Sequence, residues 1–308
     1  MPRNRSSRTH ASSTARTPAR TTWPDRTPSP DRSHSPDRSP EIEDTGPLPG
    51  GAHELGQNLL VDKQVIERVV DLVADGDLPL VEWAAGRGAV TLPLARLGRP
   101  VDAVEIDPRS VDRLGRVAPG NVTVTRGDIL RHAPPSAAYD LVCNVPFHLT
   151  TPVLRRLFTL TGWQRAVLIT QWEVARKRAA VGGTTLLTAQ WWPWFAPRLD
   201  RRIPAAAFRP RPNVDAGLLV IDRRQEPLLP AHERRAYQAF AAAVFNGRGR
   251  GLQEILARHG LARNDVRRWA REHGVGPNAL PRDLGAQAWV GAYRLTVRRT
   301  GTRRAVPG

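Results

Sequence analysis

Asn144, Pro146 and Phe147 form the segment of this sequence that is best suited to chemistry on a nucleobase. They follow a short apolar run and are expected in the loop after a buried strand. The exocyclic amine of adenine is a poor nucleophile because its lone pair is delocalised into the ring. The side-chain oxygen of Asn144 and a backbone carbonyl would accept hydrogen bonds from the two N–H groups of this amine, which would localise the lone pair on the nitrogen. Pro146 would fix the backbone that presents the carbonyl, and Phe147 would stack on a flipped-out adenine.

Three earlier segments carry glycines or carboxylates suited to a nucleotide-like cofactor. Gly86 and Gly88 allow a tight turn and a close backbone approach to a ligand. Glu105 lies seventeen residues after Gly88, where an acidic side chain accepts hydrogen bonds from ribose hydroxyls. Asp128 would accept a hydrogen bond from an adenine amino group, although a role as a helix N-cap explains this residue equally well. Asp107 is expected to be a helix N-cap. Each segment alone is a weak signal of a site, because all of them also occur in ordinary turns.

Short apolar runs alternate with helical stretches around these segments. Such alternation is typical of an α/β, Rossmann-like fold, in which a mostly parallel sheet is covered on both faces and binds ligands at the carboxyl ends of its strands. The predicted strands are 79–83, 101–106, 122–125, 140–143, 166–170 and 214–221, and the predicted helices before the last strand are 61–74, 88–97, 108–117 and 150–160. The candidate residues therefore fall in loops at one edge of the sheet.

Composition divides the chain into four parts. Residues 1–45 are rich in Arg, Ser, Thr and Pro and are expected to be a disordered basic tail. Residues 46–225 hold the predicted sheet. Residues 226–297 switch to Arg-rich helical patterns near 230–245, 248–259, 262–273 and 283–292 and are expected to form a small helical RNA-binding domain, followed by a basic C-terminal tail at 298–308.

The net charge of +17 at pH 7 favours an anionic polymer as partner, because each phosphate that is neutralised releases condensed counterions. Cys143 is the only cysteine, which excludes an intramolecular disulfide and a zinc site built on several thiolates. The histidines show no ligand spacing, so no metal is expected. No secretory signal is recognisable, and no run approaches the roughly 20 apolar residues that span a bilayer. We expect a cytoplasmic protein without a membrane partner.

The sequence resembles the rRNA adenine N6-methyltransferases, a family that contains the KsgA-type dimethyladenosine transferases and the Erm enzymes of macrolide–lincosamide–streptogramin B resistance. The resemblance covers roughly residues 53–225. It begins with Glu54-Leu55-Gly56-Gln57-Asn58-Leu59-Leu60 and includes the segment Asn144–Phe147. Three stretches are specifically similar to Erm enzymes: 171–178 with 182–184, 188–194, and 207–215.

The resemblance implies a role for each matching residue. The implied cofactor is S-adenosylmethionine (SAM), with Glu105 at its ribose, Asp128 at its adenine and Asn144 shared between its methionine end and the target amine. Phe208 would face Phe147 across the flipped adenine. Further SAM contacts are implied for Asn58, Leu60, Ala84, Gly86 and Gly88, and rRNA phosphate contacts are expected for Arg176, Lys177, Arg178, Arg209 and Arg211.

Three residues depart from the family pattern, of which Ala216, at a position where a small hydroxyl residue is common, is expected to have no consequence. Ala84 stands where the family has the first glycine of the loop, which adds a methyl group next to the cofactor. Phe147 stands where tyrosine is more common, which keeps the stacking surface and removes a hydroxyl. We expect the departures at Ala84 and Phe147 to be tolerated, with a cost in cofactor affinity at Ala84.

The resemblance favours a monomeric Erm-type enzyme that methylates N6 of one adenine in nascent or protein-free 23S rRNA and so causes antibiotic resistance. Two alternatives remain at this stage. A KsgA-type enzyme would instead dimethylate small-subunit rRNA, and a non-catalytic RNA-binding protein would use the same fold without SAM.

Overall fold

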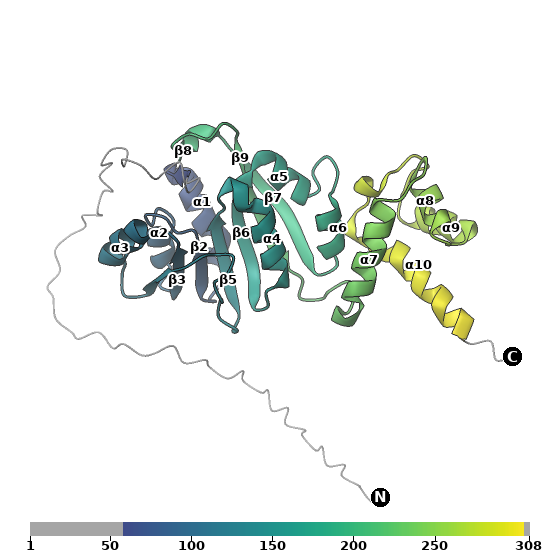
Figure 1. The fold of residues 1–308 in the computed structure, drawn as a ribbon, viewed down its shortest axis with the longest axis horizontal. Helices are drawn as coiled ribbons and strands as arrows, with labels where there is room; N and C mark the ends of the chain where they lie inside the picture. Colours follow the sequence, from purple (N-terminus) through teal and green to yellow (C-terminus); the bar gives the residue numbers. More distant parts are fainter. Residues whose placement is uncertain (1–57, 305–308) are drawn as a thin grey trace, which may run out of the picture. The chain divides into compact units, whose positions relative to one another are not determined.

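The computed structural model describes residues 58–304, with side chains through residue 297 (Figure 1). These residues belong to one structural unit. The predicted tail at 1–45 lies outside the described residues, as do the first residues of the region predicted to begin at 46.

A seven-stranded sheet forms the centre of the fold. Its order is β4-β3-β2-β5-β6-β9-β7, parallel from β4 to β6 and antiparallel at β9 and β7. The strands are β2 (Leu80–Trp83), β3 (Val101–Glu105), β4 (Val122–Arg126), β5 (Tyr139–Asn144), β6 (Trp163–Gln171), β7 (Phe195–Ile203) and β9 (Ala216–Arg223). The six predicted strands and the parallel-dominated α/β class are confirmed. Chain order reverses between β2 and β5, so the loops after these strands diverge and leave a crevice.

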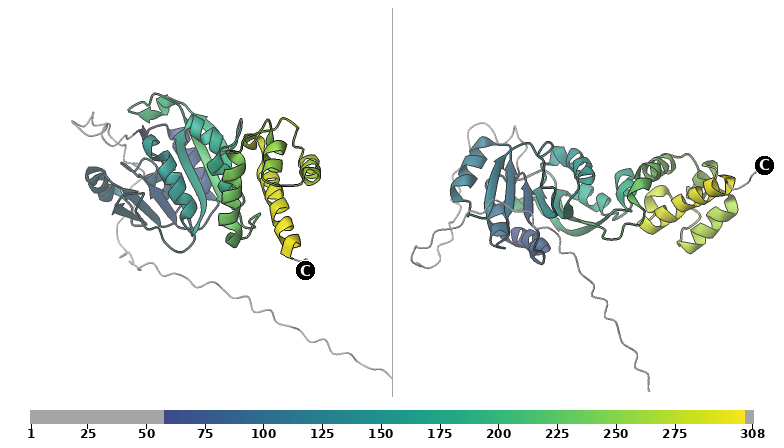
Figure 2. Two further views of the ribbon diagram at one scale, coloured as in Figure 1. Left: turned by 45° about the vertical axis from the view of Figure 1, so that its right-hand side comes forward. Right: turned by 90° about the horizontal axis from the view of Figure 1, so that it is seen from below.

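Helices cover both faces of the sheet (Figures 1 and 2). The side chains of successive strand residues alternate between two cores, one beneath the first helices and one beneath the later helices. The helices are α1 (Lys63–Ala74), α2 (Thr91–Ala95), α3 (Pro108–Val117), α4 (Thr150–Thr159), α5 (Trp172–Arg178) and α6 (Leu186–Trp191). Asp107 caps α3 as predicted, since its carboxylate accepts from the backbone N–H of Ser110 at 3.1 Å.

Several elements are absent from the sequence-based prediction. The edge strand β7 contains Pro197 and three arginines, so it lacks the apolar alternation of a strand and owes its conformation to pairing with β9. The short helices α5 and α6 are too brief for helical periodicity to reveal. A two-stranded antiparallel ribbon joins β1 (Leu59–Leu60) to β8 (Phe208–Arg209), a pairing that local sequence cannot show.

Four further helices follow the sheet: α7 (Arg234–Phe245), α8 (Leu252–Arg258), α9 (Arg263–Glu272) and α10 (Ala286–Arg304). The helix predicted to end near 292 continues to 304, and so includes residues that were predicted to form a basic tail. Residues 293–304 contain no proline, and arginine favours the helical conformation. The hydroxyl of Tyr237 in α7 donates to the carbonyl of Ala189 in α6 at 2.8 Å, and one hydrophobic cluster runs from the sheet into these helices.

Within residues 58–304, no helix is long and apolar enough to cross a membrane. The same part of the chain contains no group of three or more His, Cys, Asp or Glu side chains arranged to hold a metal ion.

The contact between α9 and α10 depends on Gly291. A Cβ at this position would collide with Nε2 of His273 and lie 2.9 Å from Nε1 of Trp269. We expect Gly291→Ala to lower the free energy of unfolding by about 1–3 kcal/mol, because the helices would have to separate. Gly115→Ala in α3 makes the same change where no atom lies within 4 Å, and should stabilise the protein by up to about 1 kcal/mol through helix propensity. Urea unfolding of both variants measures the difference, and equal effects would contradict this packing.

Candidate active site

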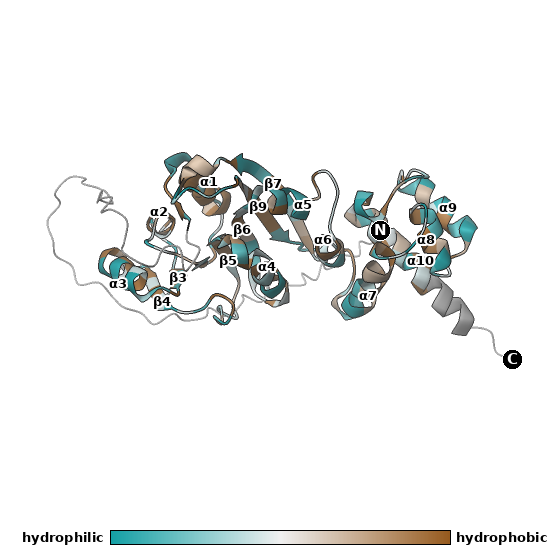
Figure 3. Cartoon of the chain, turned by 45° about the horizontal axis from the view of Figure 1, so that its top comes forward, coloured by the Kyte–Doolittle hydropathy of each residue, from teal (hydrophilic) through white to brown (hydrophobic). Residues whose placement is uncertain are grey.

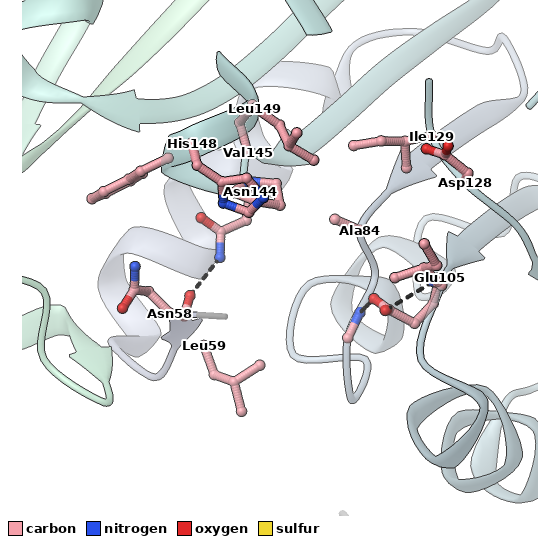
Figure 4. Close-up of a pocket in the computed structure, with 14 residues that line it drawn as sticks. Asn58, Leu59, Ala84, Glu105, Asp128, Ile129, Asn144, Val145, His148 and Leu149 are labelled. Atoms are coloured by element: carbon pink, nitrogen blue, oxygen red, sulfur yellow. Dashed lines mark hydrogen bonds between the residues drawn. The ribbon is translucent and has the colours of Figure 1, made fainter. Parts of the chain in front are cut away.

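A pocket lies at the carboxyl ends of the parallel strands, where the chain order reverses. Its lining residues come from the segment before β1 and from the loops after β2, β3, β4 and β5. They are Asn58, Leu59, Ala84, Gly86, Glu105, Ile106, Asp128, Ile129, Asn144, Val145, Pro146, Phe147, His148 and Leu149. The structure thus brings together most of the residues predicted from the sequence. Figure 4 shows Asn58 and Asn144 on one side of this pocket, across from Ala84, Glu105 and Asp128.

The loop after β2 turns through three residues with positive φ: Ala84 at 59°, Gly86 at 56° and Gly88 at 89°. Glycine adopts this conformation freely, whereas alanine does so at a cost of about 1–2 kcal/mol. Gly88 does not line the pocket. A Cβ on Gly88 would lie 2.5 Å from Cδ1 of Leu114, so this glycine permits the close packing of the loop on α3.

Glu105 holds this loop through its carboxylate. Oε2 accepts from the backbone N–H of Gly86 at 2.8 Å, and Oε1 accepts from the N–H groups of Ile106 and Asp107, both at 2.9 Å. A carboxylate offers about four acceptor positions. The three backbone donors therefore occupy three of these positions and leave one, on Oε2, for a ligand.

No helix begins at Asp128, so the predicted helix N-cap is not formed; the side chain instead closes a turn, and one of its oxygens remains accessible. Oδ1 accepts from the backbone N–H of Leu130 at 2.8 Å, which closes a turn after β4. Oδ2 lies 3.8 Å from Nε of the exposed Arg131, and the side chain is 37% exposed. The turn and a ligand can both use Asp128, because they engage different oxygens.

Ile106 and Ile129 are pocket residues that the sequence analysis missed. Ile106 is 51% exposed although it is a large apolar side chain, and Ile129 is buried. Exposed apolar surface in a pocket that also holds two carboxylates suits a ligand with a flat ring and polar substituents. The available signal was the isoleucine that directly follows each of Glu105 and Asp128.

The side chain of Asn144 has a fixed orientation. Its Nδ2 donates to the carbonyl oxygen of Asn58 at 2.9 Å, so Oδ1 is the atom left to accept a hydrogen bond. The carbonyl of Pro146 already accepts from Leu149 N–H at 2.8 Å. In contrast, the carbonyl of Val145 accepts no backbone N–H among the described residues. Oδ1 of Asn144 and the carbonyl of Val145 are therefore the two acceptors that this loop offers.

Leu60 and Phe208 do not line the pocket. Phe208 in β8 is fully buried opposite Leu60 in β1, and both belong to the core beneath α1. The structure places Phe208 in the core rather than on the pocket wall, and Phe147 packs partly against the same core, so the role of Phe208 opposite Phe147 stays a prediction.

The predicted phosphate contacts differ in how available they are. Arg176 forms a 2.8 Å ion pair with Glu173, and this hydrogen bond lowers the pKa of Glu173. Arg178 is half-buried and donates to the hydroxyl of Thr185. Nη1 of Arg209 donates to backbone carbonyls. Lys177 and Arg211 are exposed and make no ion pair with any residue the structure describes.

A histidine connects three strands behind the pocket. Nε1 of Trp83, at the end of β2, donates to Nδ1 of His132 at 3.3 Å. Nε2 of His132 lies 3.2 Å from Oδ2 of Asp102 in β3, whose Oδ1 accepts from Thr125 of β4 at 2.9 Å. Because each of these strands leads into a pocket loop, the network fixes the loops relative to one another. Sequence patterns contain no signal for it, since its members are far apart in the chain.

The fold and the site together define the class of protein: an α/β methyltransferase of the SAM-dependent type. The structure is similar to that of the 23S rRNA methyltransferase ErmE, with a TM-score of 0.72 and 30% identity over 77% of this chain and 99% of that chain. It also shares its fold with a dimethyladenosine transferase from Plasmodium falciparum, at a TM-score of 0.63 and 16% identity, covering 79% of this chain and 98% of that one.

The family model for ribosomal RNA adenine dimethylases matches residues 51–294, and the chain belongs to this family. It is 48% identical to the mycinamicin-resistance protein MyrB of Micromonospora griseorubida over 85% of this chain and 84% of that protein. It is 46% identical to an rRNA adenine N-6-methyltransferase of Corynebacterium diphtheriae over 68% of this chain and 83% of that protein. The resemblance identified from the sequence is confirmed, and the protein is an rRNA adenine N6-methyltransferase.

The positive φ of Ala84 generates a first prediction for the site. Ala84→Gly should raise the free energy of unfolding by about 0.5–1 kcal/mol, because the relieved backbone strain exceeds the extra entropy of the unfolded chain. Ala180→Gly is the matched control, since Ala180 has φ 60° and does not line the pocket. Both variants should be stabilised in urea unfolding, but only Ala84→Gly should bind SAM more tightly in calorimetry. Equal SAM affinities in the two variants would show that the Ala84 methyl group does not impede the cofactor.

Glu82 in β2 generates a second prediction. Burial raises the pKa of this carboxyl to about 8, with a further contribution from the charge of Glu105. The folded protein thus holds the proton more tightly than the unfolded chain, so this contribution to stability is full below about pH 4.5 and decreases as the pH rises towards 8. Glu82→Gln should remove up to about 1.4 kcal/mol per pH unit of this dependence. Urea unfolding between pH 5 and 8 measures the slope. The exposed Glu67→Gln should follow the wild type, and identical slopes for all three proteins would contradict a neutral Glu82.

Proposed function

We propose that the protein transfers a methyl group from SAM to N6 of a single adenine in 23S rRNA and thereby confers macrolide–lincosamide–streptogramin B resistance. Support comes from its 48% identity to a mycinamicin-resistance protein and from its likeness to ErmE at 30% identity. The structural observation that carries the chemistry is the free Oδ1 of Asn144, oriented by the bond to Asn58.

The residues of the pocket fit SAM. Ile106 and Ile129 provide apolar surface for its adenine ring, next to the accessible Oδ2 of Asp128. Oε2 of Glu105 retains an acceptor position for a ribose hydroxyl. The proposed cofactor contacts are therefore Asn58, Ala84, Gly86, Glu105, Ile106, Asp128, Ile129 and Asn144. Leu60 and Gly88 act on the cofactor indirectly, through the packing of β1 and of the loop after β2. SAM supplies an electrophilic methyl group on a sulfonium when it is bound.

The target amine is proposed to bind at the loop after β5. Oδ1 of Asn144 and the carbonyl of Val145 accept hydrogen bonds from the two N–H groups of the amine, which localises the lone pair on its nitrogen. Phe147 stacks on the base, and Pro146 fixes the backbone between these groups. Placement of the amine supplies most of the rate enhancement. The proton leaves after methyl transfer, so no strong general base is required. Phe208 supports this arrangement from the core.

The remaining assignments of the proposal concern partners and location. Lys177 and Arg211, which are exposed and unpaired among the described residues, are the strongest phosphate contacts of the predicted set. Arg176, Arg178 and Arg209 shape the surrounding surface. Residues 226–297 are proposed as a helical RNA-binding domain on a monomeric, cytoplasmic enzyme without a metal, which acts on nascent or protein-free rRNA.

Mass spectrometry of nucleosides tests the proposal directly. A protein-free 23S rRNA fragment is incubated with the protein and SAM, and a small-subunit rRNA fragment is treated in parallel. N6-methyladenosine or N6,N6-dimethyladenosine at one position of the 23S fragment supports the proposal. Modification of the small-subunit fragment alone would indicate a KsgA-type enzyme, and no product on either RNA would leave a protein that only binds RNA.

Asn144→Ala should abolish methyl transfer in the same assay while leaving RNA affinity nearly unchanged, because the phosphate contacts lie elsewhere. Retention of more than about a tenth of the rate, a loss below about 1.4 kcal/mol, would contradict the role of Oδ1. Asn144→Asp is the matched control: it keeps an acceptor oxygen but loses the donor to Asn58. It should retain more activity than Asn144→Ala if the acceptor atom matters more than the bond to Asn58.

A further inference from the structure

The charged residues of helix α9 fall into two groups, those that form ion pairs and those that do not. Arg268 forms a 2.6 Å ion pair with Asp265 and lies 4.0 Å from Glu272. Both acidic residues of the helix are therefore next to a single arginine. Arg263, Arg267 and Arg271 are all exposed and form no ion pair with any residue in the part of the chain that the structure describes. We call these three residues the α9 arginine row.

The helical repeat places the α9 arginine row on one strip of the surface. Successive members are four residues apart, which corresponds to a rise of about 6 Å and a rotation of about 40°. The row thus follows the helix axis within an arc of about 80°. The buried face of α9, with Val266, Trp269 and Ala270, lies on one side of the row. The paired Arg268 lies on the other side. Figure 3 shows the hydrophilic colouring along much of α9.

The free protein gains little stability from this arrangement. Like charges four residues apart on a helix destabilise it by about 0.2–0.5 kcal/mol per pair. Arg263 is also the first residue of α9, where the helix dipole disfavours positive charge. The N-cap residue Ala262 provides no side-chain hydrogen bond to the first turn. A negatively charged group near Arg263 would satisfy both the guanidinium and the N–H groups of that turn.

We infer that the α9 arginine row binds consecutive phosphates along one strand of an RNA, independently of base sequence. This inference rests on the proposed function for its choice of RNA as the polyanion. A row of exposed charges about 6 Å apart suits a repeating backbone better than it suits a single anion, and guanidinium groups bind phosphate in a bidentate geometry. The row forms no pocket for a base, so it adds affinity and fixes orientation while the loop after β5 selects the adenine.

A charge-matched pair of variants tests the inference. The first variant combines Arg263→Gln, Arg267→Gln and Arg271→Gln. The control combines Arg250→Gln, Arg258→Gln and Arg268→Gln, which removes three positive charges from the loop before α8, from α8 and from α9, but only at arginines that are ion-paired, to Glu254 or Asp265. Thermal unfolding establishes that both variants fold. The dissociation constant of a protein-free 23S rRNA fragment is then measured across a series of salt concentrations.

We expect the row variant to weaken RNA binding at low salt and to reduce the slope of log affinity against log salt by about 2, which corresponds to three phosphate contacts at roughly 0.7 each. The control should keep the wild-type slope. The maximal methylation rate at saturating RNA and the affinity for SAM should be unchanged in both variants, since neither touches the pocket.

Two results would overturn the inference. Equal losses of slope in both variants would mean that only the total charge matters, and an unchanged slope in the row variant would mean that RNA does not reach α9. The proposed function fails in a distinguishable way, through the absence of methylated adenosine with the wild-type protein, and the salt series remains informative in that case.

Discussion

The hydrogen bond from Asn144 to the carbonyl of Asn58 joins residues that are 86 positions apart and determines which atom of the amide the pocket receives. Because Nδ2 is engaged, Oδ1 becomes the acceptor. Asn58 directly precedes β1, and the backbone that follows β1 is held in turn, since Val61 N–H donates to the carbonyl of Ala207 at 2.9 Å beside β8. The orientation of the Asn144 side chain at the end of β5 therefore depends on the two-stranded ribbon that β1 and β8 form.

The sequence allowed the parallel sheet and most of the pocket to be predicted, because both depend on local signals. Apolar runs fix the strands, and the polar residue that ends each run must lie at the carboxyl edge. Phe208 shows where this reasoning stops, since its inward orientation comes from the pairing of β8 with β1. Strand β7 was missed for a related reason, since its own residues are those of an exposed edge. The network of Trp83, His132 and Asp102 joins three elements and has no local pattern at all.

Two buried carboxyl groups near the loop after β2 differ in the hydrogen-bond donors that surround them. Glu105 is almost fully buried yet accepts three backbone hydrogen bonds, which replace the water it has lost. Glu82 is equally buried, and its Oε2 has no hydrogen-bond partner among the described residues. Burial accordingly raises its pKa to about 8. Glu82 is therefore neutral below about pH 8, which avoids placing a second buried negative charge beside Glu105 within the sheet.

The hydrophobic cluster that continues from the sheet into α7–α10 has a consequence for how this protein can evolve. Trp194 beside the sheet packs against Tyr237 of α7, with ring centroids 5.7 Å apart, and Tyr237 packs in turn on Tyr293 of α10 at 5.4 Å. A helical segment taken from a relative would bring its own side chains to this shared core and leave gaps or overlaps there. Recombination at the connection near residue 226 would then be selected against. The two halves of the enzyme are expected to change together, through paired substitutions across this aromatic contact.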